Sequence, residues 1–304
     1  MLLRHIEWNI GFVRSPISAF LEPGFRSPIS WFPPTDPGKY LADPFAIVRD
    51  DLVYVLCEEF DYWKNKGRIV SIELTDWRRP AKARVAIELP IHVSYPYLLE
   101  NQGRVYCVPE TRRAREVALY EAEEFPDKWR RIGSLIRDFP AVDSTLFQYD
   151  GRWWLACGSS PMRRGSLFMW HAQDLFGPWK AHSNNPVKTN IHSSRPAGTP
   201  FTHGGFLYRP AQDCSRTYGG GIIINRVTRL TPTEFEEKLA AVIEPYADGA
   251  YPHGLHTLTS IGDVTLLDGQ RRRFIRPPRT ALADLRDTVL SLREKIKQTL
   301  TLEV

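Results

Sequence analysis

A strand pair that recurs about every 50 residues is the feature that most restricts how this chain can fold. The segment 41–59 (LADPFAIVRDDLVYVLCEE) reads as two strands joined by a turn, because apolar runs flank the polar residues 49–51. Cys57, Cys107 and Cys157 are spaced 50 residues apart and set the expected register of the first three copies. The further copies span residues 98–107, 146–157, 199–208 and 253–269.

Short strand pairs at this period are typical of propeller blades. One blade cannot cover both faces of its own sheet, so neighbouring blades stack, and closure into a ring removes most free edges. Five copies predict an all-β fold, a five-bladed β-propeller over residues 41–276. We expect an extended N-terminal arm over 1–40, from which the segment 6–13 completes the last blade.

Two helices are also predicted. Apolar residues at three-four spacing predict a C-terminal amphipathic helix within 277–304, which either packs on its own ring or forms a homodimer with a second copy. A scaffold that dimerises through this helix is therefore one functional hypothesis. The segment 231–234 (TPTE) offers an N-cap Thr, a Pro at the first helical position and a Glu two residues later, which predicts a short helix over 235–242.

Charge and composition restrict the partners. The net charge is +5, and much of the excess positive charge lies toward the C-terminal end of the chain, at Arg271, Arg272 and Arg273. No nucleic-acid motif accompanies these arginines. We interpret these arginines as a solvated basic edge and expect no nucleic-acid partner. No run of eighteen apolar residues occurs, so no membrane span is expected, and the N-terminus lacks the apolar core of a signal peptide. The four cysteines are expected to be buried reduced thiols. Together with the lack of a signal peptide and of a membrane span, this favours a cytoplasmic location.

Several long motifs carry a family resemblance. They are LADPF (41–45), HVSYPYLLENQGRVYCVPET (92–111), VDSTLFQYDGRWWLACGS (142–159), GPWKAHSNNPV (177–187) and FLYRPAQDCSRTYG (206–219). Over roughly residues 40–270 the chain resembles the N-terminal propeller domain of glucosamine inositolphosphorylceramide transferases. It is also similar to the five-bladed propellers of glycoside hydrolase family 43. The resemblance implies the fold and a carbohydrate-related role, but it does not extend to the transferase domain.

The candidate catalytic residues are three acids. Glycoside hydrolysis uses two carboxyl groups, one acting as acid and the other as base or nucleophile. The resemblance places Asp43 at the position of the family 43 base. Glu110 ends a strand among apolar and aromatic residues, which raise the pKa of a carboxyl group, and is the predicted acid. Asp143 is predicted to tune the other two.

The chain departs from the family 43 pattern in two places. The family is expected to place its acid on the third blade and a tuning Asp on the second, but residues 156–158 are Ala-Cys-Gly and residues 94–96 are Ser-Tyr-Pro. Either the roles lie with Glu110 and Asp143, or the channel binds a glycan without cleaving it. A channel mouth filled by Tyr95 or Arg195 would favour binding without cleavage.

Other polar residues near the expected channel ends are candidates for substrate binding. They are Glu59, His92, Tyr95, Arg195, His203, Arg209, Gln212, Asp213 and His256. Two of these are arginines, which can hold a phosphate or carboxylate through two hydrogen bonds. No metal-ligand spacing such as HExxH occurs, so no metal and no cofactor are expected.

These observations predict a carbohydrate-active propeller. It would cleave or transfer a glycosyl group of a glycan or sugar-phosphate conjugate by means of paired carboxylates. The alternative is a non-catalytic carbohydrate-binding module in glycolipid or polysaccharide biosynthesis. Aromatic residues form 12% of the chain, which suits sheet packing and sugar stacking alike.

Overall fold

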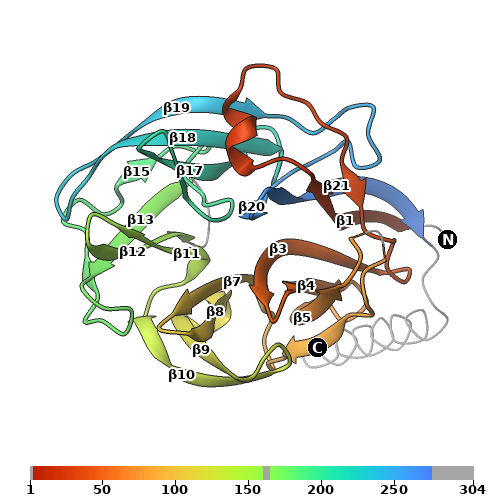
Figure 1. The fold of residues 1–304 in the computed structure, drawn as a ribbon, viewed down its shortest axis with the longest axis horizontal. Helices are drawn as coiled ribbons and strands as arrows, with labels where there is room; N and C mark the ends of the chain where they lie inside the picture. The colour runs from red at the N-terminus through yellow and green to blue at the C-terminus, as the bar shows by residue number, and fades with distance from the viewer. Residues whose placement is uncertain (1–2, 78, 160–164, 276–304) are drawn as a thin grey trace, which may run out of the picture.

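Five small antiparallel sheets follow one another around a central axis (Figure 1). The computed structural model describes residues 3–77, 79–159 and 165–275. Strands β3, β7, β11 and β20 lie nearest the axis, and in the first three sheets the later strands lie further out. The predicted all-β, five-bladed propeller is therefore confirmed.

The sheets are built as follows. The first contains β3 (Lys39–Arg49), β4 (Leu52–Asp61), β5 (Lys66–Leu74) and β6 (Arg84–Ile87). The second contains β7 (Ser94–Asn101), β8 (Arg104–Glu110), β9 (Glu116–Glu124) and β10 (Lys128–Arg137). The third contains β11 (Ala141–Tyr149), β12 (Arg152–Ser159) and β13 (Ser166–Ala172), which pairs with both β14 (Lys180–Ala181) and β15 (Lys188–Thr189). The fourth contains β16 (Phe201–His203), β17 (Phe206–Asp213), β18 (Gly221–Leu230) and β19 (Phe235–Ile243).

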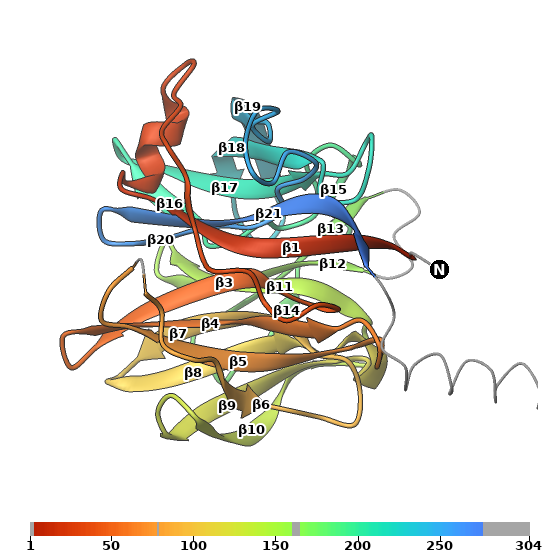
Figure 2. The same ribbon diagram turned by 90° about the vertical axis from the view of Figure 1, so that its right-hand side faces the viewer.

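The fifth sheet joins the two ends of the described chain. It contains β20 (Leu258–Ile261) and β21 (Val264–Ile275), followed outward by β1 (Leu3–Val13) and β2 (Ser30–Trp31). β1 lies antiparallel to β21 and pairs with it from Leu3 to Val13 (Figure 2). β1 contains the segment 6–13, which was predicted to complete the last blade, and it closes the ring by hydrogen bonds. The extended arm predicted over 1–40 is not supported, because Leu3–Val13 is a regular blade strand.

Helical structure is scarce in the described residues. It consists of the short 3-10 helices η1 (Ile17–Leu21) and η2 (Arg112–Ala114). Within residues 3–275, apart from the gaps given above, no helix is long and apolar enough to cross a membrane. The amphipathic helix predicted within 277–304 lies outside the described residues.

The helix predicted over 235–242 is wrong, because this segment forms strand β19. The Thr231 hydroxyl does accept a hydrogen bond from the Glu234 N–H, at 3.0 Å, as an N-cap would. This bond closes the turn between β18 and β19 instead of starting a helix. β19 then pairs with β18 from Phe235 to Ile243.

Apolar side chains between neighbouring blades form the core. Leu56 of β4 and Leu155 of β12 are fully buried in a cluster that joins the first three blades. Another cluster joins the first blade to the fifth, where Ile10 and Phe12 of β1 pack against Val55. Stacked faces thus hold the ring together, and the innermost strands are fixed well enough to position polar groups at the axis.

The four cysteines are buried free thiols, as predicted. Their expected register is wrong in the second blade. Leu56, Val108 and Ala156 occupy equivalent positions, because each lies opposite the second residue after the bulge of its neighbouring inner strand. Cys57 and Cys157 are therefore equivalent, whereas Cys107 lies two residues too early.

Candidate functional site

Three residues occupy equivalent positions on innermost strands, all at the same end of the ring. We call this end the mouth end. Asp43, Tyr95 and Asp143 each lie at a β-bulge of β3, β7 or β11. Their φ angles are 54°, 45° and 53°, in the left-handed region. That conformation costs an L-residue roughly 1–2 kcal/mol. Bulges re-aim side chains and recur near functional sites.

Acids of the preceding blade bind the backbone at each of these bulges. The Asp43 N–H donates to Asp268 Oδ2 at 3.0 Å, and the Tyr95 N–H donates to Asp43 Oδ2 at 3.2 Å. The Asp143 N–H donates to Glu110 Oε2 at 3.3 Å. These carboxyl groups therefore link neighbouring blades and satisfy buried donors, whatever else they do.

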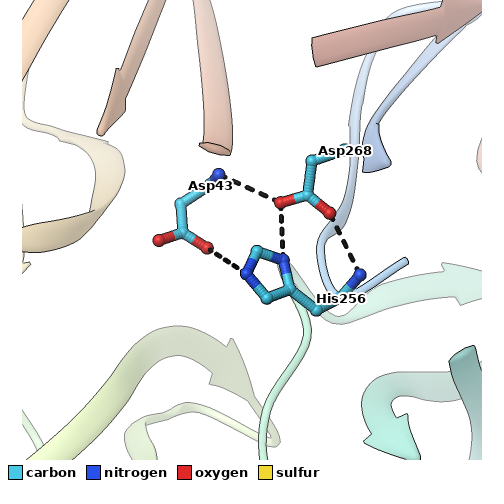
Figure 3. Close-up of side chains that lie close together, drawn as sticks. All are labelled: Asp43, His256 and Asp268. Atoms are coloured by element: carbon cyan, nitrogen blue, oxygen red, sulfur yellow. Dashed lines mark hydrogen bonds and ion pairs between the residues drawn. The ribbon is translucent and has the colours of Figure 1, made fainter. Parts of the chain in front are cut away.

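Asp43, His256 and Asp268 form one buried cluster at the junction of the first and fifth blades (Figure 3). His256 Nδ1 lies 2.6 Å from Asp268 Oδ2, and His256 Nε2 lies 3.8 Å from Asp43 Oδ1. The Thr257 hydroxyl donates to Asp43 Oδ1 at 3.0 Å. The Trp8 ring stacks on the imidazole, with 3.9 Å between ring centroids.

The charges of this cluster are coupled. Burial alone would lower the pKa of His256, but the Asp268 and Asp43 carboxylates outweigh it and raise that pKa. Burial raises the pKa of Asp43 to about 6, although His256 opposes the shift. Burial also acts to raise the pKa of Asp268, but His256 and two backbone N–H groups outweigh it and lower that pKa. The two acids thus favour the protonated form of the imidazole between them.

The same three side chains carry donor atoms that suit a cation. One ligand atom from each of Asp43, His256 and Asp268 lies within 4.8 Å of the others. The short contact between His256 and Asp268, together with the raised pKa of the imidazole, accounts for the arrangement as an ion pair. A metal would have to displace that proton.

Asp143 is held by two residues of the fourth blade. The Arg195 guanidinium donates to both carboxylate oxygens, and Gln212 Nε2 donates to Asp143 Oδ2 at 3.0 Å. The Tyr218 ring covers the guanidinium, with 4.9 Å between Arg195 Cζ and the ring centroid. Asp143 is therefore a well-compensated buried carboxylate.

Glu110 is the neighbouring acid, and its carboxyl group has fewer hydrogen bonds among the described residues than that of Asp143. Burial raises its pKa to about 8, and the Asp143 carboxylate adds to this shift, while Arg195 opposes it. Glu110 therefore holds its proton at neutral pH. The expectation that its surroundings raise its pKa agrees with this result.

Tyr95 is a buried residue that contacts two other blades. Its side chain is fully buried, and its hydroxyl accepts a hydrogen bond from the Gly198 N–H at 2.8 Å. The hydroxyl also lies 2.9 Å from Thr145 Oγ1. Tyr95 thus ties the second blade to the third and fourth, at the position where the first and third blades carry an Asp.

Four predicted site residues make no hydrogen bond or ion pair with Asp43, Glu110 or Asp143 among the described residues. Arg209 is buried in an ion pair with Glu237, at 2.6 Å, and is a structural residue of the fourth blade. His203 is exposed beside the hairpin turn that joins β16 to β17, away from the mouth end. Asp213 accepts a hydrogen bond from the Ser215 N–H at 2.9 Å and lies 3.4 Å from His192. Glu59 is bound by Arg68 at 2.6 Å on the outer side of the first blade.

Two acids near the axis were not predicted. Glu58 lies opposite Ala42 in the register of the first blade, as Glu110 lies opposite Ser94 in the second. Asp268 occupies the corresponding strand of the fifth blade. A register taken from the acids instead of the cysteines would have paired Glu58 with Glu110, at a spacing of 52 residues.

Comparison with known proteins agrees with this architecture. A model of the family described as "Glucosamine inositolphosphorylceramide transferase 1, N-terminal" matches residues 31–249. Glucosamine inositolphosphorylceramide transferase 1 of Oryza sativa subsp. japonica is 32% identical over 251 residues, which cover 77% of this chain and 34% of the relative. The protein of the same name from Arabidopsis thaliana is 30% identical over 211 residues, which cover 66% of this chain and 27% of the relative.

Among solved structures, a family 117 glycoside hydrolase from the marine bacterium Zobellia galactanivorans has a similar fold. Its TM-score is 0.56 at 15% identity, with 86% of this chain and 90% of that chain covered. The expected likeness to glycoside hydrolase propellers is thus confirmed at the level of the fold. The chain spans about a third of the length of the curated relatives it matches. It belongs to the family of glucosamine inositolphosphorylceramide transferase 1 N-terminal domains.

Proposed function

We propose that the mouth end cleaves or transfers a glycosyl group of a glycan or sugar-phosphate conjugate. The observation that carries this proposal is a pair of buried acids at the mouth end whose surroundings shift their pKa values by different amounts. The pKa of Asp43 is about 6 and that of Glu110 is about 8, so near neutral pH Asp43 is mostly ionised and Glu110 is protonated. Glycosyl transfer to water or to another acceptor needs such a base and such an acid.

Each acid has a role in this proposal. Asp43 takes the proton of the attacking hydroxyl or water, and Glu110 gives its proton to the oxygen of the leaving group. Asp143 raises the pKa of Glu110 through its negative charge, while Arg195 holds the Asp143 carboxylate in place. The relatives' name suggests a glucosamine-bearing glycolipid as one substrate class to test.

The experiment compares turnover by the wild type with that by Asp43→Asn and Glu110→Gln. Asn tolerates the left-handed backbone of residue 43, so both changes keep shape and remove the ionisable group. Free oligosaccharides, sugar phosphates and glycosides are incubated with each protein, and the products are identified by mass spectrometry. Asp50→Asn is the matched control, because Asp50 has a similar φ of 51° in an exposed turn.

We expect wild-type turnover that falls by roughly 10²–10⁴-fold in each site variant. Asp50→Asn should retain it. Turnover that survives in both site variants would refute the assignment of the acid pair.

A specific observation also favours a second function, carbohydrate recognition without cleavage. The buried Tyr95 hydroxyl is bonded to the Gly198 N–H, and Arg195 donates two hydrogen bonds to Asp143. Both are features expected of a binding module. In the same experiment this function predicts that a glycan binds without turnover and that Glu110→Gln leaves its affinity unchanged.

A further inference from the structure

Glu58 is a buried acid that the proposed reaction does not use. Its side chain is 7% exposed, and its Oε1 has no hydrogen-bond partner among the described residues. The nearest polar atom recorded is His92 Nε2, at 3.6 Å, which is too long for a hydrogen bond. A buried oxygen without a partner is rare in folded proteins and calls for an explanation.

The hydrogen bonds of His92 show which of its nitrogens carries the proton. The Gly67 N–H donates to His92 Nδ1 at 2.9 Å, so Nδ1 is an acceptor and the proton of the neutral ring is on Nε2. Nε2 is the atom that faces Glu58. The His92 side chain is 25% exposed and that of Glu58 is 7% exposed, so the imidazole is the more accessible member of the pair.

The surroundings favour the neutral form of both groups. Burial lowers the pKa of His92 to about 4, and the nearby Arg112 and Arg113 add to this shift. Burial raises the pKa of Glu58 well above its ordinary value, and the carboxylate of Asp43 is the next largest cause. The surroundings of the pair therefore favour hydrogen-bonding groups that carry no net charge.

Gly67 makes the approach of the two side chains feasible. A Cβ atom at residue 67 would lie 2.3 Å from Glu58 Oε1 and 2.9 Å from His92 Cε1. Any larger residue would push one or both groups away. The sequence thus leaves room for this pair near the end of the pairing between β4 and β5, where Gly67 lies opposite Phe60.

Aromatic rings lie beside the pair. Phe60 is two residues after Glu58, hence on the same face of β4, and packs edge-to-face on His92 with 5.9 Å between centroids. Tyr40 stacks on Phe60 at 4.9 Å, and both rings are partly exposed. Partly exposed rings next to a few polar groups are common in ligand sites.

We infer that Glu58 and His92, with the rings of Tyr40 and Phe60, form a subsite for a neutral sugar ring. The inference rests on the proposed function, because it assigns a binding position at the same mouth end. In its protonated form Glu58 can donate one hydrogen bond and accept another, and His92 Nε2 can donate a third. Neighbouring hydroxyls of a sugar supply the matching acceptors and donors, and an aromatic ring covers the apolar face of the sugar.

The test is a binding measurement by calorimetry. The probes are the methyl glycosides of glucose, galactose, mannose and N-acetylglucosamine, and the 6-phosphates of the same sugars. The variants are Glu58→Leu, which removes both hydrogen bonds, and Glu58→Gln, which keeps a donor and an acceptor. Glu59→Leu is the matched control, because Glu59 is the next residue of the same strand and points to the opposite face.

We expect at least one neutral glycoside to bind, with affinity lowered about tenfold or more by Glu58→Leu and within about threefold of wild type in Glu58→Gln. Glu59→Leu should stay within about twofold of wild type. Binding should also shift the nitrogen NMR signal of His92 Nε2 and leave Nδ1 unprotonated. Thermal unfolding of each variant verifies that it is folded.

Three results would overturn the inference. They are no binding of any neutral glycoside, equal losses in Glu58→Leu and Glu59→Leu, or stronger binding of the 6-phosphates than of the neutral sugars. Because the readout is binding, it is independent of turnover. Glycoside binding that depends on Glu58 in a protein without turnover would refute the proposed reaction and leave this subsite intact.

Discussion

The proton on Glu110 gives the sharpest test of the electrostatics at the mouth end. Its pKa rises from an ordinary 4.5 to about 8 on folding, chiefly because the carboxyl group is buried. The folded protein therefore keeps a proton that the unfolded chain releases. Between these two pKa values, each rise of one pH unit lowers the free energy of unfolding by up to about 1.4 kcal/mol.

The replacement Glu110→Gln removes this titration and keeps the shape of the side chain. The Gln oxygen can still accept the hydrogen bond that the Asp143 N–H donates to Glu110. Between about pH 5 and about pH 7.5, the two pKa values predict a loss of about 3 kcal/mol in the wild type that is absent in the variant. The variant should therefore gain stability relative to the wild type as pH rises.

Urea unfolding of both proteins across this pH range measures the difference directly. For a chain of 304 residues, about 3 kcal/mol corresponds to a relative shift in Tm of roughly 5 °C. Glu100→Gln is the control, because Glu100 lies on the solvent-exposed side of the same blade. Parallel pH profiles for the wild type and Glu110→Gln would show that Glu110 titrates normally, and would remove the acid from the proposed reaction.

Three further outcomes follow from the packing. Tyr95→Phe leaves the Gly198 N–H without its buried acceptor, so we expect the free energy of unfolding to fall by about 1–3 kcal/mol in urea; no change would show that water replaces the hydroxyl. Arg209→Met leaves Glu237 buried with a single remaining cation, Lys188, and should cost about 3–5 kcal/mol, most of which a second change of Glu237→Leu should restore; additive losses in this double-mutant cycle would contradict the ion pair. A thiol reagent should modify none of the four buried cysteines in the native protein and all four in denaturant, and rapid native labelling would refute their burial.

The fold was predictable because a repeated strand pair has few ways to bury both its faces. The repeat period and the turn residues were sufficient to predict the ring of blades. The position of Asp43 at the start of the first copy indicated which end of the ring carries the candidate site. The segment 235–242 was misassigned because its local signal is ambiguous. A Thr that binds the N–H three residues later caps a helix or closes a turn, and only the neighbouring strand β18 decides between them.

The direction in which side chains point was harder to predict. Adjacent residues of a strand face opposite sides of the sheet, so the strand register decides whether Glu58 or Glu59 points toward the site. The cysteine spacing misplaced the register of the second blade by two residues. Arg209 looked suited to a ligand because a buried partner, Glu237, is remote in sequence. Such a partner appears only when the strands are assembled.

The hydrogen bonds of the acids indicate where a ligand can bind at the mouth end. Asp268 is engaged by His256 and by three backbone N–H groups, and Asp143 is engaged by two side chains of the fourth blade. Fully bonded carboxylates offer little to a ligand, because a new contact must break an existing one. Glu58 and Glu110 have fewer partners in the described structure, occupy equivalent positions in adjacent blades, and both have raised pKa values. A sugar that bridged the first two blades would satisfy both acids, so the first two blades, and not the fourth and fifth, are where substrate recognition should be sought.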